Sequence, residues 1–437
     1  MKRPSRRLIV GRSNPLHGVC DVPGDKSISH RVALFGAMAS GVTEARNFLM
    51  AEDCLSLLAA VEALGCRVEH VGSDVRIDSD GVGAWHEPAH VLDCGNSGTA
   101  MRLLLGCLAG RPFSATLDGD ASLRTRPMGR VVGPLRLMGA EVEGTGDKCV
   151  PPITITGGGL RGLTYDLPVA SAQVKSALLL AGLQADGTTV IHQPSLSRDH
   201  TERLLPAFGA RLNIEGLTVS IDGPQNLCPA SISVPGDFSS AAYFLAAAAL
   251  VPSSEVLVEN VGLNHTRSGL LEILEDMGAD VRVSRTVSAG GEPRGDVTIL
   301  SGPLRATEVS GEIIPRAIDE LPLLAVLATQ AHGETVLRDA AELRVKESDR
   351  LEAMAAGLSA LGAKIRVLDD GWVVSGPTPL HGATLHAGLD HRVAMTLAVA
   401  GLLADGETII DGAQAVATSF PGFAAVLSSL GAQVTMQ

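Results

Sequence analysis

The chain has 437 residues, of which 45% are hydrophobic and 3% aromatic, and its formal net charge is -13. This acidic balance argues against general nucleic-acid binding and makes local groups of Lys and Arg informative. The seven Cys include no close pair, which excludes the usual zinc spacings and a disulfide framework and is typical of a reducing cytoplasm. No apolar run approaches the about 20 residues that a membrane span needs. We expect a cytoplasmic α/β or α+β protein of two or three domains, without membrane association.

The first motif in the chain is Pro-Gly-Asp-Lys-Ser-Ile-Ser-His-Arg at residues 23–31. Asp25 is a good N-cap for a helix that continues through the apolar segment behind it. Lys26, Ser27 and Arg31 would then lie near a helix N-terminus, where free N–H groups and the helix dipole attract anions. The motif therefore predicts a phosphate or carboxylate site. An ordinary capped helix with surface cations explains the same residues equally well.

A repeated signature divides the whole chain. Six Ala/Leu-rich segments end on a hydrophobic residue, Gly, and then Ala or Cys, with the glycines at 65, 139, 209, 278, 362 and 431. Each signature predicts a helix that ends on a C-cap glycine and is followed by a strand. Six copies indicate internal duplication. The Pro-Gly-Asp at 235–237 echoes the one at 23–25 and predicts that a second half begins there.

The openings of repeats two and three also carry polar and basic residues. Repeat two has a Gly-rich opening at 95–102, whose glycines would let a ligand approach the backbone, and a later Arg-rich segment at 118–128. Repeat three offers Ser171 and Gln173 as donors to hydroxyls or phosphate oxygens, and Arg198 at a later helix start. Solvated loops and plain helix starts remain the alternative interpretation of each.

Repeats five and six contain acidic residues that are candidates for catalysis. Asp319 precedes an apolar helix and is either a catalytic base or an N-cap. Lys346, Glu347 and Arg350 are expected on one helix, where Glu347 and Arg350 are three positions apart, and a salt-bridged surface helix is the alternative. Repeat six opens with Asp-His-Arg at 390–392, whose His is as consistent with a structural role as with a catalytic one.

One common motif is rejected. Residues 157–162 match G-x-G-x-x-G, but a dinucleotide site requires a helix next, and a strand-like segment follows. Neither a Walker A pattern, nor a zinc-protease helix, nor G-x-S-x-G occurs in the sequence.

Taken in order, these motifs resemble the 3-phosphoshikimate 1-carboxyvinyltransferase (EPSP synthase) family over the full length. The matching segments are those at 23–31, 95–102, 126–129, 170–176, 344–350 and 390–392. The resemblance implies an α/β (α+β) fold of two similar domains, each of three βαβαββ repeats with helices packed inside sheets. It implies one domain of residues 1–21 plus 236–437, another of residues 22–235, and an active site in the cleft between them.

The resemblance also implies a reaction. The enolpyruvyl group of phosphoenolpyruvate is transferred to the 5-hydroxyl of shikimate 3-phosphate, and phosphate is released, in the shikimate pathway towards chorismate and aromatic amino acids. Addition and elimination need a proton for the methylene carbon, a base near the hydroxyl, and cations for two phosphates and a carboxylate. No metal or organic cofactor is expected, the protein is expected to be a monomer, and the herbicide glyphosate is expected to compete with phosphoenolpyruvate.

By matching motif positions, the resemblance assigns roles to individual residues. The catalytic residues are Asp319 as proton acceptor, Glu347 as proton carrier, and Lys26. The shikimate 3-phosphate site comprises Lys26, Ser27, Arg31, Ser171, Gln173, Arg198, Asp319 and Lys346. The phosphoenolpyruvate site comprises Lys26, Gly98, Arg126, Gln173, Arg350 and Arg392. Arg suits these sites because its planar fork matches phosphate and carboxylate groups.

Three positions depart from the family pattern. Leu103 stands where many members have Pro, Ala172 replaces a Ser contact, and Thr418 stands where some members carry Lys. Two alternatives remain. One is a UDP-N-acetylglucosamine enolpyruvyl transferase, although the Cys of that family's mobile loop is missing from 121–130. The other is a non-catalytic anion-binding homologue.

Overall fold

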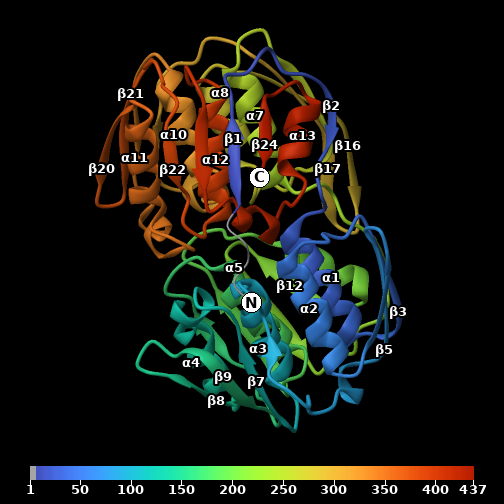
Figure 1. The fold of residues 1–437 in the computed structure, drawn as a ribbon. Helices are drawn as coiled ribbons and strands as arrows, with labels where there is room; N and C mark the ends of the chain where they lie inside the picture. The colour runs from blue at the N-terminus through green and yellow to red at the C-terminus, as the bar shows by residue number, and fades with distance from the viewer. Residues whose placement is uncertain (1–5) are drawn as a thin grey trace. The chain divides into compact units, whose positions relative to one another are not determined.

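The computed structural model describes residues 6–437. The chain forms two compact units (Figure 1). The N-terminal unit comprises Gly24–Val234 and Ser288–Glu292, and the C-terminal unit comprises the residues up to Pro23, Pro235–Val287 and Pro293–Gln437. The short segment Ser288–Glu292, which lies in the second half of the sequence but belongs to the N-terminal unit, was not predicted. The cleft that the resemblance implies stays a prediction.

The N-terminal unit contains three repeats of similar element order. Repeat one consists of α1 (Lys26–Met38), β3 (Ser40–Arg46), α2 (Glu52–Ala63), β4 (Arg67–Val71) and β5 (Asp74–Asp80). Repeat two consists of β6 (Leu92–Asp93), α3 (Gly98–Leu108), β7 (Ser114–Asp118), α4 (Gly129–Met138), β8 (Glu141–Thr145) and β9 (Val150–Thr156). Repeat three consists of β10 (Thr164–Asp166), α5 (Ala172–Gly182), β11 (Gly187–His192), α6 (His200–Leu204), β12 (Leu212–Glu215) and β13 (Thr218–Gly223), and β14 (Ser231–Ser233) follows.

The C-terminal unit continues the pattern. Repeat four consists of α7 (Phe238–Leu250), β15 (Glu255–Gly262), α8 (Gly269–Asp276), β16 (Asp280–Ala289) and β17 (Glu292–Leu300). Repeat five consists of β18 (Glu308–Val309), α9 (Ile313–Ala317), α10 (Leu321–Gln330), β19 (Gly333–Leu337), α11 (Arg350–Ala360), β20 (Lys364–Leu368) and β21 (Gly371–Gly376). Repeat six consists of β22 (Thr384–His386), α12 (His391–Gly401), β23 (Thr408–Asp411), α13 (Phe423–Ser429) and β24 (Val434–Met436), and β1 (Arg7–Val10) and β2 (His17–Asp21) precede all repeats.

The strands described in residues 6–437 form six four-stranded sheets. In repeat three, for example, β10 runs parallel to β11, and β11, β13 and β12 pair in antiparallel order. The first strands of repeats one and four come from elsewhere in the sequence. β14 pairs in parallel with β3, β2 pairs in parallel with β15, and β1 lies between β23 and β24. The segment before the first repeat therefore completes two sheets of the C-terminal unit.

The helices lie inside the sheets, as the resemblance implied. Every residue of α7 and of α12 is buried, which is possible because both helices are rich in small apolar residues around their whole circumference. α8 buries a single face. Figure 1 shows α7, α10 and α12 enclosed by the strands of their unit. Within residues 6–437, none of these helices combines the length and apolar character of a membrane span.

The predicted helix ends are confirmed at all six glycines. Gly65, Gly139, Gly209, Gly278, Gly362 and Gly431 all have positive φ angles, from 82° to 113°. Glycine adopts this left-handed conformation without the steric cost that a Cβ atom brings. The same signature thus ends a helix in every repeat and turns the chain into the following strand.

Candidate active site

The start of α1 holds Lys26 beside an acid. Asp25 caps the helix as predicted, since its Oδ1 accepts a hydrogen bond of 2.8 Å from the N–H of Ile28. Lys26 Nζ lies 3.2 Å from Asp53 Oδ2, and both side chains are largely buried. Asp53 was not predicted as a site residue, because an acid in the first turn of α2 is also what helix-dipole stabilisation alone would favour.

Arg31 is almost fully buried within the N-terminal unit. Its guanidinium donates to Thr201 Oγ1 at 2.7 Å, to Ser176 Oγ at 2.8 Å and to the Ser27 carbonyl at 2.9 Å. Burial lowers the pKa of Arg31 to about 10, against the effect of the Glu202 carboxylate. These bonds join α1 to α5 and α6. The predicted contact of Arg31 with shikimate 3-phosphate stays a prediction.

A second group of polar residues joins α3 to α5. Gln173 accepts a hydrogen bond of 2.6 Å from Arg102 and donates one of 2.8 Å to Thr99. A Cβ atom on Gly98 would lie 3.0 Å from Nη1 of Arg102 and 3.4 Å from Nη1 of Arg126. The structure therefore brings together Gly98, Arg126 and Gln173, three of the predicted phosphoenolpyruvate residues. Arg102, the last residue of the motif at 95–102, belongs with them through its bond to Gln173.

Ser171 and Arg198 lie at the starts of two other helices of this unit. Ser171 caps α5 by accepting from the N–H of Val174. Arg198 precedes α6, and its charge disfavours the charge of Arg31, so the two cations face a common region. Cations beside helix N-termini form an environment suited to phosphate oxygens.

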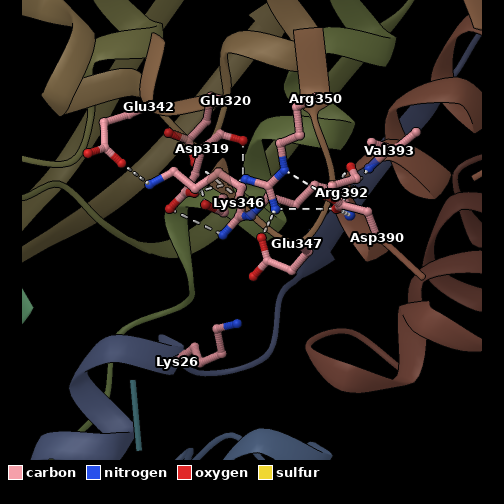
Figure 2. Close-up of polar contacts among 12 residues, drawn as sticks. Lys26, Asp319, Glu320, Glu342, Lys346, Glu347, Arg350, Asp390, Arg392 and Val393 are labelled. Atoms are coloured by element: carbon pink, nitrogen blue, oxygen red, sulfur yellow. Dashed lines mark hydrogen bonds and ion pairs between the residues drawn. The ribbon is translucent and has the colours of Figure 1, made fainter. Parts of the chain in front are cut away.

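In the C-terminal unit Asp319 is not a helix cap. α10 begins at Leu321, and the side chain of Asp319 turns towards arginines instead (Figure 2). Asp319 Oδ1 lies 3.4 Å from Arg350 Nη1, and Oδ2 lies 3.4 Å from Arg392 Nη2. The carboxylate is 14% exposed, so it is held among cations yet accessible. This arrangement favours the interpretation of Asp319 as a base over that as a cap.

The helix predicted over 344–350 is wrong. α11 begins at Arg350, because Asp349 accepts hydrogen bonds from the N–H groups of Leu351 and Glu352 and so starts the helix after itself. Lys346 has an extended backbone between a short 3₁₀ helix and α11. The expected pairing of Glu347 with Arg350 nevertheless forms, with 2.6 Å between Oε2 and Nη2.

Arg350 is the most deeply buried cation of this group, with a side chain that is 1% exposed. Its Nε and Nη2 donate to the two oxygens of Asp390 at 2.8 and 3.2 Å. Burial lowers its pKa, but the charges of Asp390 and Glu347 raise it above the ordinary value for Arg. Burial also lowers the pKa of Lys346, against the effect of Asp319 and Glu342. Asp390 was expected only as part of the motif at 390–392, and its pairing with Arg350 was not predicted.

Thr418, which departs from the family pattern, and His391, whose role the sequence left open, are both buried. The hydroxyl of Thr418 donates to the carbonyl of Ala415 within the same 3₁₀ helix. His391 is buried in the first turn of α12. Among residues 6–437 no group of three or more His, Cys, Asp or Glu is placed to hold a metal ion.

Each unit taken alone thus presents part of an inventory for anion chemistry. The N-terminal unit places Lys26 and a group of arginines at helix starts. In the C-terminal unit, Arg350 and Arg392 lie beside Asp319, and Arg350 also donates a hydrogen bond to Glu347. Preorganised cations of this kind stabilise charge that develops on phosphate or carboxylate oxygens.

Comparison with known proteins agrees with this inventory. The model of the family "EPSP synthase (3-phosphoshikimate 1-carboxyvinyltransferase)" matches residues 10–427. The 3-phosphoshikimate 1-carboxyvinyltransferase of Geobacillus kaustophilus is 51% identical over 417 residues, covering 95% of this chain and 98% of the relative. That of Anaeromyxobacter sp. is 52% identical over 426 residues, covering 97% of this chain and 96% of the relative.

Solved structures add the fold. The EPSP synthase of Acinetobacter baumannii is 44% identical and superposes with a TM-score of 0.89, covering 99% of this chain and all of the other. The enolpyruvyl transferase NikO of Streptomyces tendae has a TM-score of 0.82 at 23% identity, covers 99% of both chains, and shares the fold. On the match of the family model and of relatives at half identity over nearly their full length, the chain belongs to the EPSP synthase family.

Proposed function

We propose that this protein transfers the enolpyruvyl group of phosphoenolpyruvate to the 5-hydroxyl of shikimate 3-phosphate and releases phosphate. Membership of the family supports the reaction, and the observation that carries it is the placement of Asp319 between Arg350 and Arg392 with Glu347 alongside. An acid-base pair and cations for anionic substrates are what this addition and elimination require.

The proposed chemistry has two steps. In the addition, Glu347 delivers a proton to the methylene carbon of phosphoenolpyruvate. Asp319 accepts the proton of the 5-hydroxyl while the hydroxyl oxygen bonds to the carbon of phosphoenolpyruvate that carries the phosphate. In the elimination, the new methyl group returns a proton to Glu347 and the carbon–oxygen bond to phosphate breaks, so that phosphate leaves with the bridging oxygen and takes up the proton held by Asp319. Lys26 and Lys346 offset the negative charge that the tetrahedral intermediate carries.

The proposal assigns the substrates to the residues matched by the family motifs. Shikimate 3-phosphate is bound by Lys26, Ser27, Arg31, Ser171, Gln173, Arg198, Asp319 and Lys346. Phosphoenolpyruvate is bound by Lys26, Gly98, Arg126, Gln173, Arg350 and Arg392. The proposal requires both units to supply groups to one pair of substrates, because each set contains residues of both units. That the protein is a cytoplasmic monomer stays a prediction.

A phosphate-release assay tests this function. Release should require phosphoenolpyruvate and shikimate 3-phosphate together, and phosphoenolpyruvate alone should give none. UDP-N-acetylglucosamine in place of shikimate 3-phosphate separates the two enolpyruvyl transferases, and release with that acceptor alone would reassign the substrate. Calorimetric binding of shikimate 3-phosphate without any phosphate release would identify a non-catalytic homologue.

Gly98→Ala should weaken inhibition by glyphosate, the inhibitor expected to compete with phosphoenolpyruvate. The added methyl group would lie 3.0 Å from Nη1 of Arg102, so the ends of the neighbouring arginines must shift. We expect inhibition about tenfold weaker, which corresponds to a loss of about 1.4 kcal/mol in binding. Initial rates at varied phosphoenolpyruvate concentrations measure this, with Gly129→Ala as control, since a Cβ there meets nothing closer than 3.7 Å. Noncompetitive inhibition of the parent would contradict the placement of Gly98.

A further inference from the structure

The residue after Asp319 is a second buried acid that the proposed reaction leaves unused. Glu320 has a side chain that is 1% exposed. Its Oε1 accepts a hydrogen bond of 2.8 Å from Arg267 and another from the hydroxyl of Ser239. Its Oε2 is buried and has no hydrogen-bond partner among the described residues. The charge of Glu320 is therefore balanced by neighbouring arginines.

Arg267 faces both adjacent acids at once. The same nitrogen, Nη1, lies 2.8 Å from Glu320 Oε1 and 3.9 Å from Asp319 Oδ2. The guanidinium is 3% exposed and also donates to the Ser239 hydroxyl. Burial lowers the pKa of Arg267, but the charges of Glu320, Asp319 and Asp237 raise it above the ordinary value, so Arg267 stays a cation. Both acids therefore share one buried positive charge.

Figure 2 shows Asp319 among charged side chains that include Glu320, Arg350 and Arg392. Asp390 binds Arg350 through both oxygens, and Glu320 binds Arg267, so two of the three arginines that approach Asp319 have acids of their own. Other charged or titratable groups that face this cluster are Asp237, Tyr243, Lys346, Glu347 and His391. Glu320 Oε1 also lies 3.8 Å from Nη1 of Arg392. Without Glu320, the charge of Arg267 would act on Asp319 with Asp237 as its other acid.

We propose that Glu320 is a positioning residue that neutralises Arg267 and so keeps Asp319 basic enough to accept the substrate's hydroxyl proton. This rests on the proposed function, in which Asp319 is that base. A carboxylate beside an uncompensated cation at this distance holds its proton less readily, and a weaker base transfers protons more slowly. Glu320 itself touches neither substrate in this scheme, because its bonds are made to Arg267 and Ser239.

The test is the pH dependence of kcat for phosphate release in a set of variants. Glu320→Gln removes the charge but keeps the shape. We expect its acidic limb to move to lower pH by about one unit, and its kcat at neutral pH to fall about tenfold. Glu320→Asp keeps the charge. The acidic limb of its pH–kcat profile should therefore lie at the same pH as in the parent, even if kcat itself falls.

The double variant Arg267→Gln/Glu320→Gln separates charge from structure. It removes both members of the pair, so the balance around Asp319 is restored, and its acidic limb and kcat should return close to those of the parent. This variant also leaves neither member of the pair as an unpaired buried charge, so a displaced limb in it overturns the inference even if Glu320→Gln does not fold. Glu272→Gln is the matched control, because Glu272 pairs with Arg316 in the same unit and is 44% exposed.

The outcomes are distinct. A parent-like limb in the double variant, with a lower one in Glu320→Gln, supports the inference. An unshifted limb in a folded Glu320→Gln, or a displaced limb in the double variant, overturns it and leaves Glu320 a structural partner of Arg267. Calorimetric binding of shikimate 3-phosphate reports folding independently of turnover. A parent protein that releases no phosphate would instead contradict the proposed function.

Discussion

Asp319→Asn should lower kcat by about 10²–10⁴-fold while the affinity for shikimate 3-phosphate changes little, because a positioned base contributes that much to the chemical step alone. Asparagine keeps the size of the side chain, and its one amide oxygen can still accept a hydrogen bond from one of the two arginines, Arg350 and Arg392, that lie 3.4 Å from the two carboxylate oxygens. It cannot take up a proton from a hydroxyl group. Steady-state phosphate release and calorimetry on the same preparation measure the two quantities.

The control for this variant is Glu312→Gln. Glu312 is an exposed acid next to α9 in the same unit, and its replacement should leave kcat within about twofold of the parent. If Asp319→Asn also stays within about twofold, Asp319 is not the base. A loss of binding together with turnover would assign Asp319 to substrate recognition instead.

Arg350→Gln should destabilise the protein by about 3–5 kcal/mol, because it leaves buried carboxylates without their cation. Arg350 is 1% exposed, and its main partner Asp390 is fully buried. The variant should also bind phosphoenolpyruvate poorly, since Arg350 belongs to the proposed site. Denaturant unfolding at neutral pH measures the stability, and Arg344→Gln, which breaks a partly exposed pair with Asp349, should cost less than Arg350→Gln.

The stability loss of Arg350→Gln should depend on pH. Burial acts to raise the pKa of Asp390, but the charge of Arg350 more than offsets this and lowers it below the ordinary value. The stabilisation from this pair is therefore present above the pKa of an unfolded Asp, about 4, and is lost as the pH falls through the lower value of the folded protein. In the variant, burial and the charge of Glu347 act to raise the pKa of Asp390 without Arg350 to offset them, so protonation of Asp390 relieves the destabilisation. The difference in unfolding free energy between parent and variant should shrink as the pH falls towards 4, and a constant difference would contradict this account.

Local features of the fold were predictable because they depend on neighbouring residues. The glycines that end helices and the caps at Asp25 and Asp237 follow from backbone conformation and short-range hydrogen bonds. The helix expected at 344–350 failed for a local reason as well, since Asp349 is itself a strong N-cap and starts α11 one residue later. The N-cap residue Asp349 is visible in the sequence, but the helical spacing of Lys346, Glu347 and Arg350 favoured an earlier helix start.

The partners of the site residues were not predictable, because they come from distant parts of the chain. Lys26 with Asp53, Arg350 with Asp390, and Arg267 with Glu320 are pairs that form only when separate elements pack together. An acid next to an apolar helix is compatible with a cap, a surface ion pair or a buried partner, and the sequence does not choose among them. The pairing of β14 with β3 and of β2 with β15 is non-local in the same way.

Enolpyruvyl transfer by addition and elimination leaves a signature that NMR of the product formed in D₂O detects. With both substrates present, we expect a new enol ether on the 5-hydroxyl of shikimate 3-phosphate. Its methylene group should carry deuterium, because a solvent-derived proton is added to the methylene carbon before one is lost. An ether whose methylene group holds no deuterium would contradict the mechanism, and the absence of any ether would contradict the function.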